Sequence, residues 1–391
     1  MSDLFVINLP TKVYYGDQLD NNLASEVLRF GKNVMIVYGG QSVKRIGLLD
    51  RVRGLLEDAG CNVYEYSGIK PNPRHSQCEE AAEMCRQYSV DVVIGIGGGS
   101  VLDASKLIAA QRYHNGSAWD LVIRRDIPDK VLPVIAILTN AATGSETDGT
   151  AVITNEELHR KKGWKNPLLV PKVAFTDPTL TFSVNPYVTA CGCADIFNHV
   201  LETYLSPNKG LYMLDTFMEG MMKTVVRYSV IAYQEPENYE ARSNIMLASS
   251  WAINGFVRSG RPHVWPMHQM EHELSAFYDI PHGHGLAIIM PRYMRYVLNG
   301  ETAHRFYQLG ISVFGVDPKL SDMDAAQETI TRLEDWLFNQ LSLPSHLSDL
   351  GITAEHFQEM AASIKEFSGD PLGGFVPLKG NQIIDILNMC L

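Results

Sequence analysis

Histidines are concentrated in one short part of this sequence. Of the twelve histidines, five fall between positions 263 and 284: His263, His268, His272, His282 and His284. Imidazole is the commonest metal ligand near neutral pH, and a solvent-exposed surface does not explain this density. The cluster therefore predicts a metal site or a catalytic histidine site.

A second pair of potential ligands precedes the cluster. Asp195 and His199 are four residues apart, so one face of a helix would carry both. Such a pair alone is more often a salt bridge or a cap, but here the surrounding helix is apolar and an unpaired carboxylate would be unfavourable to bury. A Zn²⁺ or Fe²⁺ site needs three or four ligands from more than one element. His268 could supply a third ligand and His282 a fourth.

The segment from His268 to His272 differs from the metalloprotease motif that it partly matches. In H-E-x-x-H the glutamate directly follows the first histidine, whereas Gln269 stands there in this chain. We expect Glu271 to point elsewhere on the helix, which argues against a protease. The thiols of Cys191 and Cys193 are interpreted as small buried groups rather than ligands.

A glycine-rich run indicates a phosphate-binding loop. Gly97, Gly98, Gly99 and Ser100 follow a buried strand and precede a helix. Glycines let the backbone approach a phosphate, and the free amides of the helix start can bind the anion. The run is not the Rossmann fingerprint, because Ser100 replaces the last glycine.

Two further loops at strand ends are candidate cofactor contacts. Gly39, Gly40, Gln41 and Ser42 contain no carboxylate that would hold the adenosine ribose, and Lys44 and Arg45 are nearby, which favours NADP(H) over NAD(H). The later loop is rich in small and hydroxylated residues, among them Thr139, Asn140 and Thr143. By itself this later signal is weak.

The elements that must position these residues divide the chain into two halves. Strands are predicted at 34–38, 62–66, 91–96 and 134–138, alternating with helices over about 43–59 and 76–88 and from about 101. This alternation predicts parallel strands with ligands at their carboxyl ends. From about Asn185 the pattern is helical. We therefore expect an α/β dinucleotide-binding domain over 1–184 and an all-helical domain over 185–391, with a ligand cleft between them.

Composition excludes several classes of protein. A chain of 391 residues with a net charge of −11 is unsuited to non-specific binding of nucleic acid or anionic membranes. No apolar run reaches the roughly 18 residues of a membrane-spanning helix. The basic run from His159 to Lys162 fits a local anion site or a solvated turn. Six cysteines without framework spacing indicate reduced thiols in a cytoplasmic protein.

Taken in order, these motifs resemble the iron-containing (group III) alcohol dehydrogenases, especially the NADP(H)-dependent butanol dehydrogenase-like aldehyde reductases. The resemblance covers nearly the whole chain, and its matching segments are Tyr38-Gly39-Gly40, Pro71-Asn72-Pro73, Gly97 to Asp103, Thr143 to Glu146, Asp177-Pro178, Asp195-x3-His199 and His268-x3-His272-Glu273-Leu274-x7-His282-Gly283. It implies a Rossmann-like domain of the dehydroquinate synthase type followed by a helical domain. One departure is Gln41, where the family usually has a third glycine.

The resemblance also implies roles for individual residues. Asp195, His199, His268 and His282 would bind one divalent metal, Fe²⁺ or Zn²⁺, and His272 would be a proton relay beside it. The cofactor would contact Gly39, Gly40, Ser42, Asn72, Gly97, Gly98, Gly99, Ser100, Asp103, Thr139, Asn140, Thr143 and Lys161. Either Lys161 or Lys162 occupies the position of the family's lysine.

The implied activity is hydride transfer between NADP(H), with NAD(H) possible, and a primary alcohol or aldehyde such as butanol or butanal, in a cytoplasmic homodimer. A polyol dehydrogenase of the same fold is the alternative. A cyclising synthase ranks low because it needs several lysines and arginines around a phosphorylated substrate, and the region 251–290 supplies only Arg258 and Arg261. A metallohydrolase with structural glycine loops and a non-catalytic binding module are the remaining possibilities.

Overall fold

The computed structural model describes residues 5–207, 210–262 and 264–391. By its internal packing the chain divides into an α/β unit, Asn8–Val184, and a helical unit, which comprises Asn185–Leu391 and the described residues before Asn8.

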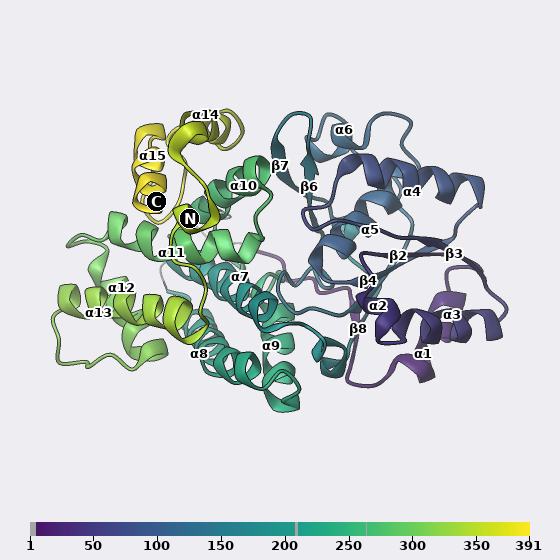
Figure 1. Ribbon diagram of the computed structural model, residues 1–391, viewed down its shortest axis with the longest axis horizontal. Helices are drawn as coiled ribbons and strands as arrows, with labels where there is room; N and C mark the ends of the chain where they lie inside the picture. The colour runs from purple at the N-terminus through teal and green to yellow at the C-terminus, as the bar shows by residue number, and fades with distance from the viewer. Residues whose placement is uncertain (1–4, 208–209, 263) are drawn as a thin grey trace. The chain divides into compact units, whose positions relative to one another are not determined.

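Within Asn8–Val184, all of which the structure describes, six parallel strands form one sheet in the order β1-β8-β5-β4-β2-β3 (Figure 1). The strands are β1 (Lys12–Tyr15), β2 (Asn33–Tyr38), β3 (Asn62–Tyr66), β4 (Val92–Gly97), β5 (Val134–Leu138) and β8 (Val173–Thr176). The central strands β4 and β5 are buried along their whole length because helices cover both faces of the sheet. The four strands predicted from the sequence are confirmed, and β1 and β8 are additional.

The alternating side chains of β2 show how the two faces are covered. Val34 and Ile36 pack in a core cluster with α1 (Leu19–Leu28) and α3 (Leu48–Asp58). Met35 and Val37 pack in the other cluster, with α4 (His75–Gln87), α5 (Gly99–Gln111) and α6 (Ala118–Val122). The prediction of one continuous helix over about 43–59 is wrong. The segment is divided into α2 (Ser42–Arg45) and α3, because Gly47 between them has a φ of 72°.

The direction of chain winding reverses beside β2. The chain continues from β2 to β3 at the sheet edge and then crosses back to β4 on the other side of β2. In open α/β sheets, ligands bind at the carboxyl ends of strands on either side of such a reversal. The loops that follow β2 and β4 are the two glycine loops.

An antiparallel hairpin follows β5 in the chain. It consists of β6 (Thr150–Asn155) and β7 (Arg160–Lys165), and it pairs Thr154 with Lys161. The basic run of the sequence thus lies at the turn and in β7. Its lysines gave no apolar alternation from which a strand could be predicted.

The helical unit is built from helices that begin at clear signals. Asn185 caps α7 by accepting a bond from the amide of Val188, and Pro186 occupies the first turn. The helices of the described part are α7 (Pro186–Leu205), α8 (Tyr212–Gln234), α9 (Tyr239–Ala252), α10 (Pro266–Tyr278), α11 (His282–Val297), α12 (Ala303–Leu309), α13 (Asp322–Glu334), α14 (Phe357–Ser368) and α15 (Gly380–Met389). From Thr189 onward, every residue of α7 is buried.

Three of these helices pack around one another. Helix α7 contacts α11, and α10 contacts α11. Helix α10 ends at Tyr278. The next residue, Asp279, adopts a left-handed conformation with φ of 51°, and α11 begins three residues after it. This tight turn brings the start of α11 back against α10, which determines where its first residue, His282, can lie.

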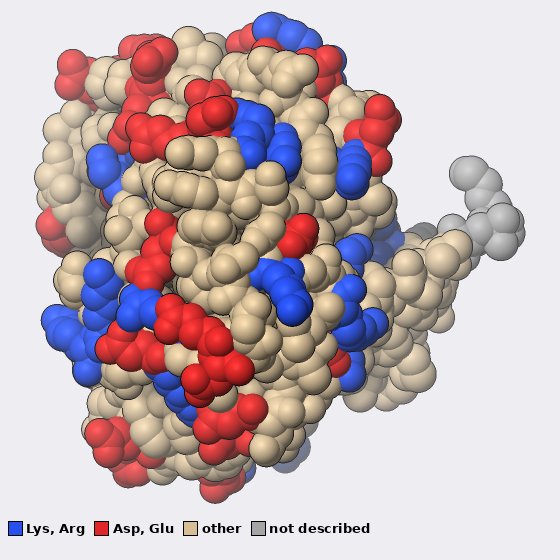
Figure 2. Space-filling model, turned by 90° about the vertical axis from the view of Figure 1, so that its right-hand side faces the viewer, with Lys and Arg blue, Asp and Glu red and all other residues tan. Residues whose placement is uncertain are grey.

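The surface carries both signs of charge. Figure 2 shows Lys and Arg interspersed with Asp and Glu over the face that it presents. Among the described residues, no helix is long and apolar enough to cross a membrane.

Candidate functional site

The loop after β4 lies directly against the loop after β5. A Cβ atom added to Gly99 would lie 2.4 Å from Oγ1 of Thr143, and one added to Gly98 would lie 3.2 Å from Cβ of Asn140. The amide of Thr139 also donates to the carbonyl of Gly97 at 3.0 Å. The two predicted cofactor loops therefore form one surface, and glycine is required where they meet.

The loop after β2 reaches the same helix start. A Cβ atom on Gly39 would lie 3.1 Å from the carbonyl oxygen of Ile69 and 3.6 Å from Cγ2 of Val101, in the first turn of α5. Gly40 has open space around it. Ser42 begins α2, and Lys44 lies over the ring of Tyr38 at 5.3 Å.

Asn72 and the β6–β7 hairpin are also neighbours. The amide of Thr154 donates to the carbonyl of Pro73 at 2.8 Å, next to Asn72, which is buried with φ of 50°. Lys161 is buried and pairs with Thr154 in the hairpin. Lys161 and Lys162 point to opposite faces of β7, since successive residues of a strand alternate.

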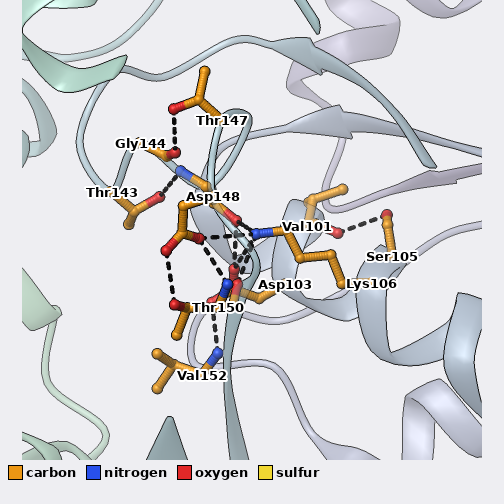
Figure 3. A network of polar contacts seen from close by, with 11 residues as sticks. Val101, Asp103, Ser105, Lys106, Thr143, Gly144, Thr147, Asp148, Thr150 and Val152 are labelled. Carbon is orange, nitrogen blue, oxygen red and sulfur yellow. Dashed lines mark hydrogen bonds and ion pairs between the residues drawn. The ribbon is translucent and has the colours of Figure 1, made fainter. Parts of the chain in front are cut away.

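Asp103 is engaged within the protein. Its Oδ1 accepts from Oγ of Ser145 at 2.6 Å, and its Oδ2 accepts from the amide of Val152 at 2.8 Å (Figure 3). Burial raises the pKa of Asp103 to about 6, although Lys106 and these two donors oppose the rise. Asp103 thus links α5 to Ser145, two residues after Thr143, and to Val152 in β6.

Lys106 is a functional candidate that the sequence reasoning missed. It is completely buried and donates to Ser145 at 2.7 Å, to Asp148 at 3.3 Å and to the carbonyl of Thr150 at 2.6 Å. Its position three residues after Asp103, on the same face of the helix, was the available signal. Figure 3 shows the ammonium group of Lys106 directed toward Asp148 and Thr150.

In the helical unit, three of the predicted ligands converge. Oδ1 of Asp195 lies 3.9 Å from Nε2 of His268 and 3.7 Å from Nε2 of His282. All three donor atoms lie within 4.8 Å of one another. Asp195 and His268 are buried, and the His282 side chain is 21% exposed. The three residues come from α7, α10 and α11, so the packing of three helices assembles the group.

The fourth predicted ligand is adjacent. Nδ1 of His199 lies 3.4 Å from Oδ1 of Asp195, and its ring centroid lies 4.6 Å from that of His268. Trp265 packs against both histidines, with centroid distances of 5.3 Å to His199 and 4.8 Å to His268. Of the aromatic residues considered from the sequence as a substrate wall, Trp265 is therefore at the histidines. Trp251 and Phe256 instead pack with Phe217.

Two buried glutamates contact the outer nitrogens of the histidines, and the sequence reasoning missed both. The carboxylate of Glu202 is bonded to Nδ1 of His268, and that of Glu271 to Nδ1 of His282. Glu271, which was expected to point elsewhere on the helix than the metalloprotease glutamate does, contacts His282. Glu202 could have been found from its spacing, because it follows Asp195 by seven residues and His199 by three on one helical face.

The remaining histidines have different surroundings. His272 is buried, and its ring centroid lies 5.5 Å from that of His282. His284 is completely buried, with Nε2 bonded to the carbonyl of Pro344 and Nδ1 to the hydroxyl of Tyr187, each at 2.9 Å. Burial lowers the pKa of His284, so it is a structural group with both nitrogens occupied. His263 lies outside the described residues.

The donor set fits a divalent metal ion. Ligand atoms that share one ion at about 2.0–2.2 Å are separated by roughly 3–3.5 Å, close to the distances around Asp195. One carboxylate and three imidazoles suit Zn²⁺ or Fe²⁺. Burial raises the pKa of Cys191 and of Cys193 to about 12, so both remain thiols at neutral pH.

Comparison with known proteins gives concordant results over both units. Residues 10–178 match the family model "Iron-containing alcohol dehydrogenase", and residues 189–390 match "Fe-containing alcohol dehydrogenase family, C-terminal". The chain is 41% identical over 382 residues to NADH-dependent butanol dehydrogenase B of Clostridium acetobutylicum, covering 98% of each chain. It is 32% identical to NADPH-dependent aldehyde reductase YqhD of Escherichia coli, covering 94% of this chain and 95% of the relative.

A solved structure shows the same fold. The crystal structure described as NADH-dependent butanol dehydrogenase A from Thermotoga maritima superimposes with a TM-score of 0.93 at 33% identity, covering 99% of this chain and 98% of the other.

Proposed function

Because this chain belongs to the iron-containing alcohol dehydrogenase family, we propose that it transfers hydride between NADP(H) and a primary alcohol or aldehyde such as butanol or butanal. The α/β unit would hold the cofactor and the helical unit the metal, with Asp195, His199, His268 and His282 as its ligands. The observation that carries the proposal is the convergence of the Asp195 carboxylate and two histidine nitrogens from three helices.

The chemistry divides between bound groups and the chain. When bound, a divalent ion supplies Lewis-acid stabilisation of the alcohol or aldehyde oxygen, and the nicotinamide carries the hydride. The amides at the start of α5 would bind the pyrophosphate, and the loops that meet at Gly99 and Thr143 would orient the dinucleotide. Trp265 would exclude water beside the ligands. His272 would carry the alcohol proton toward solvent.

The central test is metal dependence. We expect the purified protein to contain a divalent metal, to lose NADPH-dependent butanal reduction when a chelator removes it, and to recover on reconstitution. Activity that survives complete metal removal would overturn the proposal.

The oligomeric state of the same samples would be measured by sedimentation, since a homodimer is the predicted state.

The cofactor preference needs its own test. The chain has Ser42, Lys44 and Arg45 after β2 and no carboxylate in the loop Gly39–Ser42, which supports NADP(H). Relatives named NADH-dependent favour the alternative, NAD(H). We expect a higher kcat/KM with NADPH than with NADH on butanal, and a clear NADH preference would contradict the assignment.

A further inference from the structure

We propose that Glu202 and Glu271 are positioning residues of the metal site, which hold His268 and His282 so that their Nε2 atoms face Asp195. The inference rests on the proposed function, because it concerns how the same site is organised. Neither glutamate was among the residues expected from the sequence to serve this site.

The first pair joins α7 to α10. Glu202 is buried on α7, and its Oε1 accepts from the amide of Met267 at 2.6 Å. Its other oxygen, Oε2, is bonded to Nδ1 of His268. Two contacts to neighbouring residues of α10 therefore hold the carboxylate in place, and the His268 ring is fixed relative to α7.

The second pair joins α10 to α11. Glu271 is completely buried on α10; its Oε1 accepts from Oγ of Ser275, and its Oε2 is bonded to Nδ1 of His282. A Cβ atom added to Gly285 would lie 2.9 Å from Cγ of Glu271. The glycine thus leaves the room that Glu271 needs to lie against α11.

The two pairs form a series. Helix α7 supplies the carboxylate for the histidine of α10, and α10 supplies the carboxylate for the histidine of α11. Each helix is thereby oriented by the one before it. The Asp195 carboxylate of α7 lies 3.9 Å and 3.7 Å from the two histidines at their other nitrogen, Nε2.

The chemistry of the pairs determines which nitrogen can bind a metal. Where the carboxylate oxygen accepts the hydrogen bond, Nδ1 of the histidine carries the proton. In the neutral ring the lone pair then lies on Nε2, the atom that faces Asp195. Outer partners of this kind fix the tautomer and the orientation of ligating histidines.

The experiment measures metal binding rather than turnover. Apo protein would be titrated with Zn²⁺ against a competing chelator, and with Co²⁺ to record its ligand-field absorption spectrum. The variants are Glu202→Gln and Glu271→Gln. The matched control is Glu273→Gln, since Glu273 is equally buried on α10 but accepts from Ser363 at 2.8 Å.

We expect each of the two variants to bind Zn²⁺ roughly 10- to 100-fold more weakly than wild type and to shift the Co²⁺ bands. The control should bind within about 2-fold of wild type. Glu202→Asp and Glu271→Asp keep the charge but shorten its reach, and they should give intermediate affinities. They also provide a second measurement should a glutamine variant fail to fold.

The outcomes separate the two levels of the proposal. Wild-type protein that binds neither Zn²⁺ nor Co²⁺ would overturn the proposed function itself. Wild-type protein that binds both, with glutamine and aspartate variants indistinguishable from Glu273→Gln in affinity and spectrum, would overturn the positioning role alone.

Discussion

In the α/β unit the candidate ligand contacts come from backbone at the ends of strands, whereas in the helical unit they come from side chains along buried helices. The glycines after β4 leave no room for added atoms beside Thr143. The carboxylate of Asp195 and the imidazoles of His268 and His282 bring their potential ligand atoms within 4.8 Å of one another. The two units should therefore fail under opposite kinds of substitution: added atoms in the first and removed atoms in the second.

Both units bury charged groups, but the surroundings differ. Lys106 is enclosed by Asp103, Asp148 and Ser145, and its contacts link one part of the chain to another. Glu202 and Glu271 instead face histidines whose other nitrogen atoms approach Asp195. The buried Lys106 thus links loops of the α/β unit, whereas the buried Glu202 and Glu271 orient candidate ligands in the helical unit.

The largest effect is expected from removing the shared carboxylate. Asp195→Ala should lower kcat for butanal reduction at least about 1,000-fold, since the several kcal/mol supplied by a bound metal are lost with the ion. Metal content and turnover would be measured together. The control is Asp322→Ala, which removes an exposed aspartate 3.0 Å from His304 and should leave activity unchanged. Full metal content in Asp195→Ala would contradict the comparison.

The next effect concerns Lys106. Lys106→Met should lower the free energy of unfolding by about 3 kcal/mol, because Asp103 and Asp148 would remain buried without their cation. The measurement is the free energy of unfolding in urea, taken from the transition of the α/β unit. Metal content should not change, because Lys106 and its partners belong to the α/β unit and the predicted metal ligands belong to the helical unit. The double variant Lys106→Met with Asp148→Asn should recover part of the loss; no recovery would show that the charge balance is not the cause.

A smaller effect is expected from adding one methyl group to the glycine loop. Gly99→Ala should raise the KM for NADPH about 10-fold with a lesser change in kcat, because Thr143 must move and overpacking of this kind costs about 1–3 kcal/mol. The control is Gly54→Ala, on α3, where a Cβ atom meets nothing within 4 Å. That change should stabilise the protein by about 0.5–1 kcal/mol. An unchanged KM in Gly99→Ala would separate the loop from cofactor binding.

The smallest effect is a pH dependence in the α/β unit. Burial alone would raise the pKa of Glu26, but bonds from Lys12, Tyr14 and Arg29 lower it to about 2, from 4.5. Because the folded-state pKa is depressed, the stabilisation is complete above pH 4.5 and is lost as the pH falls toward 2. Lys12 and Arg29 are more than half exposed, so screening limits the contribution to about 1 kcal/mol.

Glu26→Gln provides the measurement. Its free energy of unfolding should fall below that of wild type at pH 7, and the difference should shrink as the pH drops from 5 to 3. A difference that is constant with pH would mean that the ionised carboxylate of Glu26 is not the source.

Local patterns predicted much of the fold. The apolar runs of β2, β4 and β5, together with the glycines that follow β2 and β4, were sufficient to predict a parallel sheet with ligand loops. Strand β7 could not be predicted, because Arg160–Lys165 is basic and its pairing with β6 is a contact that no local pattern encodes. Gly47, by contrast, was a readable signal for the break between α2 and α3.

The histidines of the candidate site could be predicted from the sequence, but their contacts with the glutamates could not. Asp195 and His199 share a helical face, and the density of histidines after position 263 indicates a ligand cluster. The partners of Glu202 and Glu271 lie on other helices, so only helix packing reveals them. Lys106 was missed for a related reason, since its three hydrogen-bond partners, Ser145, Asp148 and Thr150, lie 39, 42 and 44 residues away in the chain.

The glycine that follows His282 has a consequence for altering this enzyme. A Cβ atom at Gly283 would lie 1.9 Å from the carbonyl oxygen of Cys191, so the backbones of α7 and α11 touch at that point. The spacing between the helices that carry Asp195 and His282 is thus limited by main chain rather than by replaceable side chains. Variants meant to widen the site should therefore keep glycine at position 283.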